Sequence, residues 1–228
     1  MGDSDVTRWS VIRGAAEGQK EARETFASRY LPPVRAYLGA RWRGTPHLQE
    51  TDDAVQNVFV ACFKDKGVLA NVRPGRPGGF RSYFYGVIRN TALFMERTWS
   101  RRRDRPRASP LPLEALGTDE PHLSGVFDRE WARAILREAA NRQAERAEEK
   151  GDRTKRRVEL LRLRFEDGLP IREIAHRWEV EAAWLHHEYS RARREYREAL
   201  VEVVAYHHPS GADGIEEEVS RLLDAFAD

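Results

Sequence analysis

The chain has 228 residues, of which 33% are charged and 40% are hydrophobic, and it contains a single cysteine, Cys62. This apolar content is too high for a disordered chain. One cysteine cannot form a disulfide within the chain, which favours a reducing compartment. The first residues lack the apolar core of a secretory signal, and no apolar run is long enough to span a membrane. The sequence therefore predicts a cytoplasmic protein with no membrane segment.

The net charge of +2 combines two opposed halves. Residues 1–110 contain 20 Lys and Arg against 11 Asp and Glu, whereas residues 111–228 contain 19 against 26. A field of a single sign steers association with partners of the opposite sign. The first half is therefore the better candidate for binding nucleic acid.

Nearly all of the chain is predicted to be helical, because apolar residues recur at three- and four-residue spacing and strand-like alternation is absent. The predicted helices of the first half cover about residues 7–14, 19–38, 50–63 and 80–100, with Pro32 and Pro33 interrupting the second. Those of the second half carry the apolar stripes 127–135, 158–165, 171–178 and 185–200.

A proline-rich segment without helical periodicity separates the halves, at the point where the sign of the charge changes. The predicted fold is therefore all-α, with two helical domains joined by a flexible linker. The predicted boundaries are 7–103 for the first domain, 104–125 for the linker, 126–208 for the second domain and 209–228 for an acidic amphipathic tail.

The last two helices of the second domain are predicted to form a helix-turn-helix, with a short helix, a turn near residues 179–181 and a longer helix. The longer helix has an apolar side formed by Leu185, Tyr189, Ala192 and Tyr196. The opposite side, suited to phosphates and base edges, carries Ala183, His187, Ser190, Arg191 and Arg194. The alternative is an amphipathic helical hairpin without a DNA-binding role.

Aromatic and basic residues are interleaved along residues 80–107. Aromatic rings stack on unpaired bases while guanidinium groups hold the backbone, so this composition suits single-stranded DNA. The stripe expected to be buried consists of Phe84, Val87, Ile88, Thr91 and Met95. Tyr83 points away from that stripe and is the best candidate for stacking. The alternative is a core helix with an arginine-rich end.

Three segments resemble sigma factors of the sigma-70 family, most closely the extracytoplasmic-function group. Its promoter-melting and −10-reading segment is similar to Phe80-Arg-Ser-Tyr-Phe-Tyr-Gly-Val-Ile-Arg-Asn90. Its acidic polymerase-binding helix is similar to Glu50-Thr-Asp-Asp-Ala-Val-Gln-Asn-Val-Phe59. The start of its −35-reading domain is similar to Leu160-Leu-Arg-Leu-Arg-Phe-Glu-Asp-Gly-Leu-Pro-Ile-Arg-Glu-Ile-Ala175, and the match continues at Ser190-Arg-Ala-Arg193. The segments agree with the family in order and spacing across about residues 9–205.

The resemblance implies a protein that binds core RNA polymerase and directs promoter-specific transcription initiation, and that catalyses no bond chemistry itself. Its partners would be the β′ and β subunits of the polymerase and promoter DNA. The residues implied to meet β′ are Glu50, Asp52, Asp53 and Gln56, although the acidic ones also suit helix capping. Those assigned to the melted −10 strand are Phe80, Arg81, Tyr83, Arg89, Asn90 and Arg97. The loop at residues 73–79 stands where the family holds a flipped base. The resemblance assigns the −35 contacts to the outward side of the last predicted helix, as defined above.

The chain departs from the family pattern at several positions. Asn57 stands where the family usually has a glutamate, and Glu179 replaces a glycine common at the turn. The segment Trp184-Leu-His-His-Glu188 is less basic than its counterpart, which predicts weak or unusual −35 recognition. Glu188 would repel phosphate unless it pairs with a neighbouring arginine.

The sequence offers little support for a metal site or an enzyme. His186 and His187 are adjacent rather than four residues apart, which disfavours a metal site, and neither a cofactor motif nor a catalytic set indicates an enzyme. The rival binding hypothesis is a helix-turn-helix regulator that never engages polymerase. The tail is expected to cover part of the second domain or to regulate DNA binding, through an apolar stripe formed by Ile215, Val219, Leu222, Leu223 and Phe226. Control by an anti-sigma factor or a kinase is left open.

Overall fold

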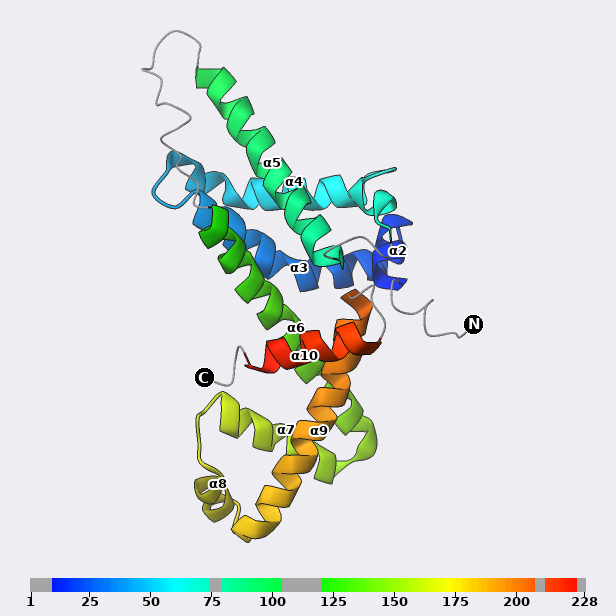
Figure 1. Ribbon diagram of the computed structural model, residues 1–228, viewed down its shortest axis with the longest axis vertical. Coiled ribbons are helices and arrows are strands. Elements are labelled where there is room, and N and C mark those ends of the chain that lie inside the picture. Colours follow the sequence, from blue (N-terminus) through cyan, green and yellow to red (C-terminus); the bar gives the residue numbers. More distant parts are fainter. Residues whose placement is uncertain (1–9, 74–78, 104–119, 208–211, 225–228) are drawn as a thin grey trace. The chain divides into compact units, whose positions relative to one another are not determined.

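The computed structural model describes residues 10–73, 79–103, 120–207 and 212–224, which are helical apart from short turns and contain no strand (Figure 1). The predicted all-α class is therefore confirmed. The helices are α2 (Ser10–Ala16), α3 (Lys20–Arg41), η1 (Pro46–Glu50), α4 (Thr51–Phe63), η2 (Val68–Asn71), α5 (Gly79–Arg103), α6 (Glu120–Lys150), α7 (Asp152–Phe165), α8 (Ile171–Arg177), α9 (Ala182–His207) and α10 (Ala212–Asp224). Within these described ranges, no helix is both long and apolar enough to cross a membrane.

The chain divides into two compact units. The N-terminal unit comprises Met1–Ala134 with Tyr206–Ser210, and the C-terminal unit comprises Ile135–Ala205 with Gly211–Asp228. The division falls between Ala134 and Ile135, inside α6, rather than in the predicted linker at 104–125. Most of that linker, residues 104–119, lies outside the described residues, as do residues 74–78 of the loop assigned to a flipped base.

The start of α6 explains why the linker prediction extended too far. Residues 120–125 form the first turns of this helix, with Glu120 and Pro121 as its first two residues. Both residue types are favourable in a first helical turn, because the carboxylate complements the helix dipole and proline lacks an amide that would be unpaired there. The proline that indicated a linker therefore marks the beginning of a helix.

The core of the N-terminal unit is an aromatic cluster formed by α3 and α5. Phe26 is fully buried, and its ring centroid lies 4.5 Å from that of Tyr30 and 5.6 Å from that of Phe84. Trp131 of α6 joins the cluster, with its ring stacked on Tyr30 at 5.1 Å and 6.2 Å from Phe80. The first part of α6, expected to belong to a separate second domain, thus shares the core of the first.

Helix α3 runs without interruption through Pro32 and Pro33, contrary to the predicted break. The residues that it buries before the prolines, such as Phe26 and Tyr30, and those after them, such as Val34 and Tyr37, lie in the same core. Burial on both sides offsets the backbone hydrogen bonds that the prolines cannot donate.

A buried ion pair joins the end of α3 to α5. Arg41 Nε lies 2.7 Å from Glu96 Oε1, Arg41 Nη2 lies 3.0 Å from Glu96 Oε2, and the side chains are 3% and 11% exposed. The indole Nε1 of Trp42 donates a third hydrogen bond to Glu96 Oε1 at 2.8 Å. Although burial acts to lower it, the hydrogen bond to Glu96 raises the pKa of Arg41 above its ordinary value. The pair is charged and fully hydrogen-bonded, as a buried pair must be.

In the C-terminal unit, α7, α8 and α9 share a hydrophobic cluster. Its buried members are Leu160, Leu163, Ile171, Ile174, Ala175 and Leu185. The second half of α6 is tied to α9 by Gln143, whose side chain donates to the carbonyl of Ala192 at 3.0 Å, and by Tyr196, whose hydroxyl donates to the carbonyl of Leu136 at 3.0 Å. The predicted inward side of the last helix is therefore the observed one.

The tail forms α10, as its apolar stripe predicts. Ile215, Val219 and Leu222 are buried, and Glu216 forms an ion pair with Arg197 of α9. An amphipathic stripe of this kind needs a covering surface, which accounts for the helix without invoking regulation. The regulatory role suggested for the tail stays a prediction.

Candidate functional site

The acidic face of α4 is exposed. Asp52, Asp53 and Gln56 are solvent-exposed and Glu50 is half-buried at the preceding junction, whereas Val55 and Val58 are buried on the other side of the helix. Asp52 lies 2.8 Å from Arg35 Nη2, but both side chains are more than half exposed, so this pair contributes little to stability. The acidic residues in the first turn also complement the helix dipole, so the two roles weighed from the sequence are compatible.

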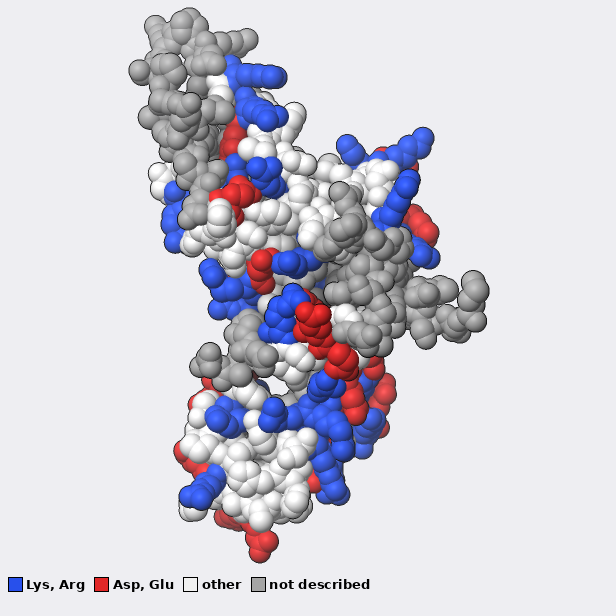
Figure 2. Space-filling view, viewed as in Figure 1, with Lys and Arg blue, Asp and Glu red and all other residues white. Residues whose placement is uncertain are grey.

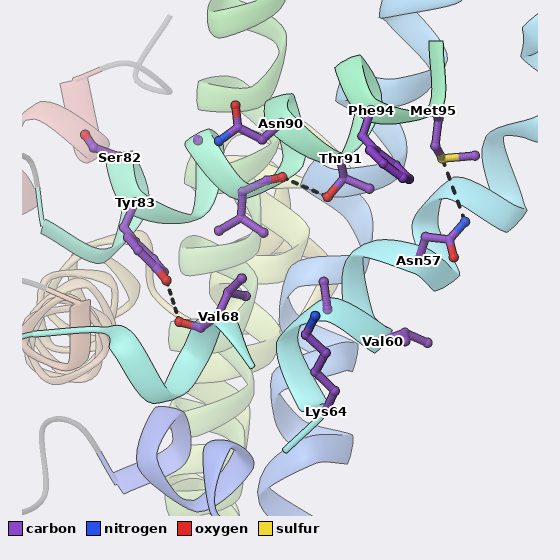
Figure 3. Close-up of a pocket in the computed structure, with 13 residues that line it drawn as sticks. Asn57, Val60, Lys64, Val68, Ser82, Tyr83, Asn90, Thr91, Phe94 and Met95 are labelled. Carbon is purple, nitrogen blue, oxygen red and sulfur yellow. Dashed lines mark hydrogen bonds between the residues drawn. The ribbon is translucent and has the colours of Figure 1, made fainter. Parts of the chain in front are cut away.

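A groove of about 640 Å³ adjoins this face, between α4, η2 and α5 (Figure 3). Its polar lining includes Asn57, Lys64, Ser82, Tyr83 and Asn90, and its apolar lining includes Val60, Val87, Phe94 and Met95. Phe94 is 69% exposed and Val60 is 55% exposed, and both line this groove. The groove thus offers an accessible ring, hydrogen-bonding groups and one ammonium in a single concavity.

Asn57 and Tyr83 shape this groove. The Asn57 amide lies 3.8 Å from the Met95 sulfur, to which it donates, and thereby joins α4 to α5 (Figure 3). The Tyr83 hydroxyl donates to the carbonyl of Val68 in η2, and its ring stays partly exposed along the groove. Asn57, a departure from the family pattern, is therefore part of the groove rather than of the acidic face alone.

The assignment of Phe80 to single-stranded DNA is wrong. Its side chain is 1% exposed, and its ring stacks on Phe84 with the centroids 5.6 Å apart. The buried line of α5 runs through Phe80, Phe84, Ile88 and Ala92, so the stripe predicted from the sequence was rotated slightly around the helix. No base can stack on a ring enclosed in the protein core.

Arg81 and Arg89 are both engaged by carboxylates of α6. Arg81 forms an ion pair with Asp128, and Arg89 Nε lies 2.9 Å from Glu120 Oε1. Partial burial acts to raise the pKa of Glu120, but the Tyr85 hydrogen bond and the Arg89 charge outweigh it and hold that pKa below its ordinary value. Two of the three arginines assigned to the −10 strand therefore already bind anionic groups of the same chain.

Asn90 and Arg97 are exposed, as the −10 assignment requires. Figure 2 shows Lys and Arg side chains gathered along the C-terminal part of α5 on the face in view. The structure thus brings Tyr83 and Asn90 to one groove, leaves Arg97 on the exposed surface of the same helix and removes Phe80 from the set.

Three further residues that line the groove, Lys64, Ser82 and Phe94, were not assigned from the sequence. Phe94 lies four residues after Asn90 and so shares its face, a spacing that could have identified it.

The outward side of α9 is arranged as predicted. All five of its assigned residues are exposed: Ala183, His187, Ser190, Arg191 and Arg194. The Ser190 hydroxyl lies 3.0 Å from the carbonyl of His186, to which it donates. Arg194 forms no ion pair with any other described residue, so its guanidinium is available to an anion.

Glu188 is buried beneath this side rather than exposed on it. Its carboxylate lies 2.7 Å from Arg153 Nη2, 2.7 Å from Arg157 Nε and 3.2 Å from Arg191 Nη1, and its side chain is 4% exposed. The hydrogen bond from Arg153 and the nearby Arg157 charge overcome partial burial and lower the pKa of Glu188 to about 2. The alternative of pairing with arginine is confirmed, and the expected repulsion of phosphate by this residue falls away.

The turn between α8 and α9 keeps the backbone that a glycine would favour. Glu179 has a φ of 54°, in the left-handed region that costs a non-glycine residue about 1 kcal/mol. The backbone amide of Val180 nevertheless donates to the carbonyl of Ala175 at 3.0 Å. The replacement of glycine therefore does not abolish the turn.

Among the described residues, no group of three or more His, Cys, Asp and Glu side chains is arranged to hold a metal ion. Neither a scan against protein-family models nor a search of curated proteins found a match for this chain.

Proposed function

We propose that this protein is a promoter-recognition factor of the sigma type, which binds core RNA polymerase and directs promoter-specific transcription initiation. The observation that carries the proposal is the juxtaposition of two surfaces on adjacent helices. The acidic face of α4 adjoins a groove whose lining combines accessible aromatic and amide groups, Tyr83, Asn90 and Phe94. A plain DNA-binding regulator needs no exposed acidic helix beside its nucleic-acid groove.

The acidic face of α4 would bind the basic coiled coil of the β′ subunit. Asp52, Asp53 and Gln56 are exposed and lie on a rigid helix, so they need no rearrangement to meet a partner. The proposal also includes contacts with the β subunit and control by an anti-sigma factor. No surface of the protein is assigned to either of them.

The groove between α4 and α5 would hold the melted −10 strand. Capture of unstacked bases by aromatic rings offsets the cost of opening a duplex, and stacking of this kind contributes about 1–3 kcal/mol per base. Phe94 and Tyr83 supply the rings, Asn90 an amide that can pair with a base edge, and Lys64 a charge for the backbone.

The α8–α9 pair would act as the helix-turn-helix that contacts the −35 element. Arg191 and Arg194 lie on the outward side of α9, and the buried Glu188 carboxylate fixes the position of Arg191. Phosphate contacts by such arginines supply affinity, whereas base-edge contacts supply specificity. With His187 and Ser190 in place of fixed charges, binding should depend only weakly on salt.

The proposal is tested by binding to immobilised core RNA polymerase. Asp52→Arg combined with Asp53→Arg is expected to weaken binding by about tenfold or more, because two attractive charges become repulsive at the interface. The matched control is Glu17→Arg combined with Glu24→Arg, which reverses two exposed carboxylates elsewhere in the N-terminal unit and should leave the affinity unchanged.

The alternative, a helix-turn-helix regulator, predicts no retention of the wild-type protein on core polymerase at any salt concentration. If the wild type is retained and the α4 double variant is retained equally well, the role given to α4 is wrong.

A further inference from the structure

One face of α5 binds carboxylate groups of the same chain. Arg81, Tyr85 and Arg89 follow one another at four-residue spacing and therefore lie along one side of the helix. The first half of α6 faces them with two carboxylates, Glu120 and Asp128.

Glu120 is held by several donors at once. Its Oε1 accepts hydrogen bonds from the Tyr85 hydroxyl at 2.7 Å and from Arg89 Nε at 2.9 Å. At its other oxygen, Arg41 Nη1 lies 3.5 Å away. Asp128, two turns further along α6, accepts from Arg81 Nη1. The donor set of guanidiniums and a hydroxyl is one that phosphate oxygens also satisfy.

These two ion pairs are more exposed to solvent than the buried Arg41–Glu96 pair of the same unit. The side chains of Arg81 and Asp128 are 39% and 41% exposed, and those of Arg89 and Glu120 are 43% and 32% exposed. Arg41 and Glu96, in contrast, are nearly inaccessible. Half-exposed pairs contribute about 1 kcal/mol or less, so a competing anion can draw Arg81 and Arg89 away from the carboxylates at small cost, while Glu120 keeps its contacts with Tyr85 and Arg41.

Displacement requires no movement of α6. Phe127 and Trp131 anchor the helix in the aromatic core, while the arginine side chains reach solvent and can turn away from their partners. Arg81 and Arg89 are eight residues apart, about 12 Å along a helix, so a single small anion cannot bridge them. An extended polyanion can.

We propose that Arg81 and Arg89 form a site for the phosphates of single-stranded DNA. In the free protein, Asp128 and Glu120 of α6 occupy this site until DNA displaces them. This site rests on the proposed function and adds to it an intramolecular competitor. The acidic side chains mimic phosphate, so the free protein binds single strands more weakly than its arginines would allow.

The test is fluorescence anisotropy of a labelled oligothymidine titrated with the full-length protein at several salt concentrations. Glu120→Gln combined with Asp128→Asn keeps the side-chain shapes and removes both charges. It is expected to tighten binding about three- to tenfold and to steepen the dependence of log affinity on log salt by about 0.7 for each arginine released. Circular dichroism checks that the variant is folded.

Two further variants separate a freed site from a general change in charge. Glu130→Gln removes a carboxylate of α6 that pairs with Arg133 of the same helix, and it should leave both affinity and salt dependence unchanged. Adding Arg81→Gln and Arg89→Gln to the Glu120→Gln, Asp128→Asn variant should abolish the gain. A gain that persists without the arginines would overturn the proposal.

The outcomes also separate this proposal from the function on which it rests. One outcome would refute only the intramolecular competition by Glu120 and Asp128. In that outcome the wild type binds the oligonucleotide and Asn90→Ala weakens this binding, but the Glu120→Gln, Asp128→Asn variant binds no more tightly than the wild type. No binding by the wild type or by any variant would count against both the competitor and the proposed single-strand groove.

Discussion

Glu96→Ala is expected to lower the free energy of unfolding of the N-terminal unit by about 3–5 kcal/mol, because it removes the nearest counter-ion of a buried guanidinium and leaves only the Glu120 carboxylate, 3.5 Å from Arg41 Nη1. Arg41 is only 3% exposed and cannot turn to water, and the Trp42 indole loses its acceptor as well. The substitution therefore removes three hydrogen bonds and the closest opposite charge from the junction of α3 and α5.

Hydrogen exchange of backbone amides in α3 and α5 measures this loss, with circular dichroism as a check on the folded state. Glu96→Gln keeps an acceptor for the indole without the charge and should fall between the wild type and Glu96→Ala. Glu24→Ala breaks an exposed pair with Lys20 and should change stability by less than about 0.5 kcal/mol. Equal effects for Glu96→Ala and Glu24→Ala would contradict the ion pair as described.

Glu188→Gln is expected to destabilise the C-terminal unit at neutral pH by about 2–3 kcal/mol and to remove part of its acid sensitivity. The folded-state pKa of about 2 lies below the ordinary value of 4.5, so the carboxylate stabilises the folded state at pH values above the ordinary one. That contribution is lost as the pH falls from about 4.5 to about 2. Arg153 and Arg191 are about half exposed, which keeps the effect below that of Glu96→Ala.

Urea denaturation of the wild type and the variant at pH 7, 4 and 3 measures this linkage. The difference in unfolding free energy between them should be largest at pH 7 and should shrink toward pH 3. Glu159→Gln is the matched control, since Glu159 pairs with Arg162 at 2.8 Å but both side chains are more than 40% exposed. A difference between wild type and Glu188→Gln that does not vary with pH would show that the carboxylate acts only through packing.

The outward side of α9 could be predicted from the sequence because helical geometry alone fixes which positions face each other. Leu185 and Ala192 are buried and His187 and Arg194 exposed, as the 100° rotation per residue requires. Phe80 was assigned to DNA by the family resemblance, although it lies four residues before Phe84 and so shares the buried side of α5. The sequence alone does not show that its ring meets Phe26.

Partners distant in sequence could not be predicted. Arg81 and Arg89 were assigned to the −10 strand, and only the packing of α6 shows that Asp128 and Glu120 pair with them. The same packing places Trp131 in the aromatic core of the N-terminal unit, although the prolines before it suggested a linker. The buried side of one helix follows from its own residue spacing, whereas ion pairs between helices depend on tertiary contacts.

In vitro transcription with purified core RNA polymerase over a library of promoter fragments tests whether this protein directs promoter-specific initiation. Addition of the wild-type protein should produce discrete transcripts whose start sites share upstream sequence elements, and Asp52→Arg combined with Asp53→Arg should reduce their yield in proportion to the loss of core binding. Identical transcripts with and without the protein would contradict the account.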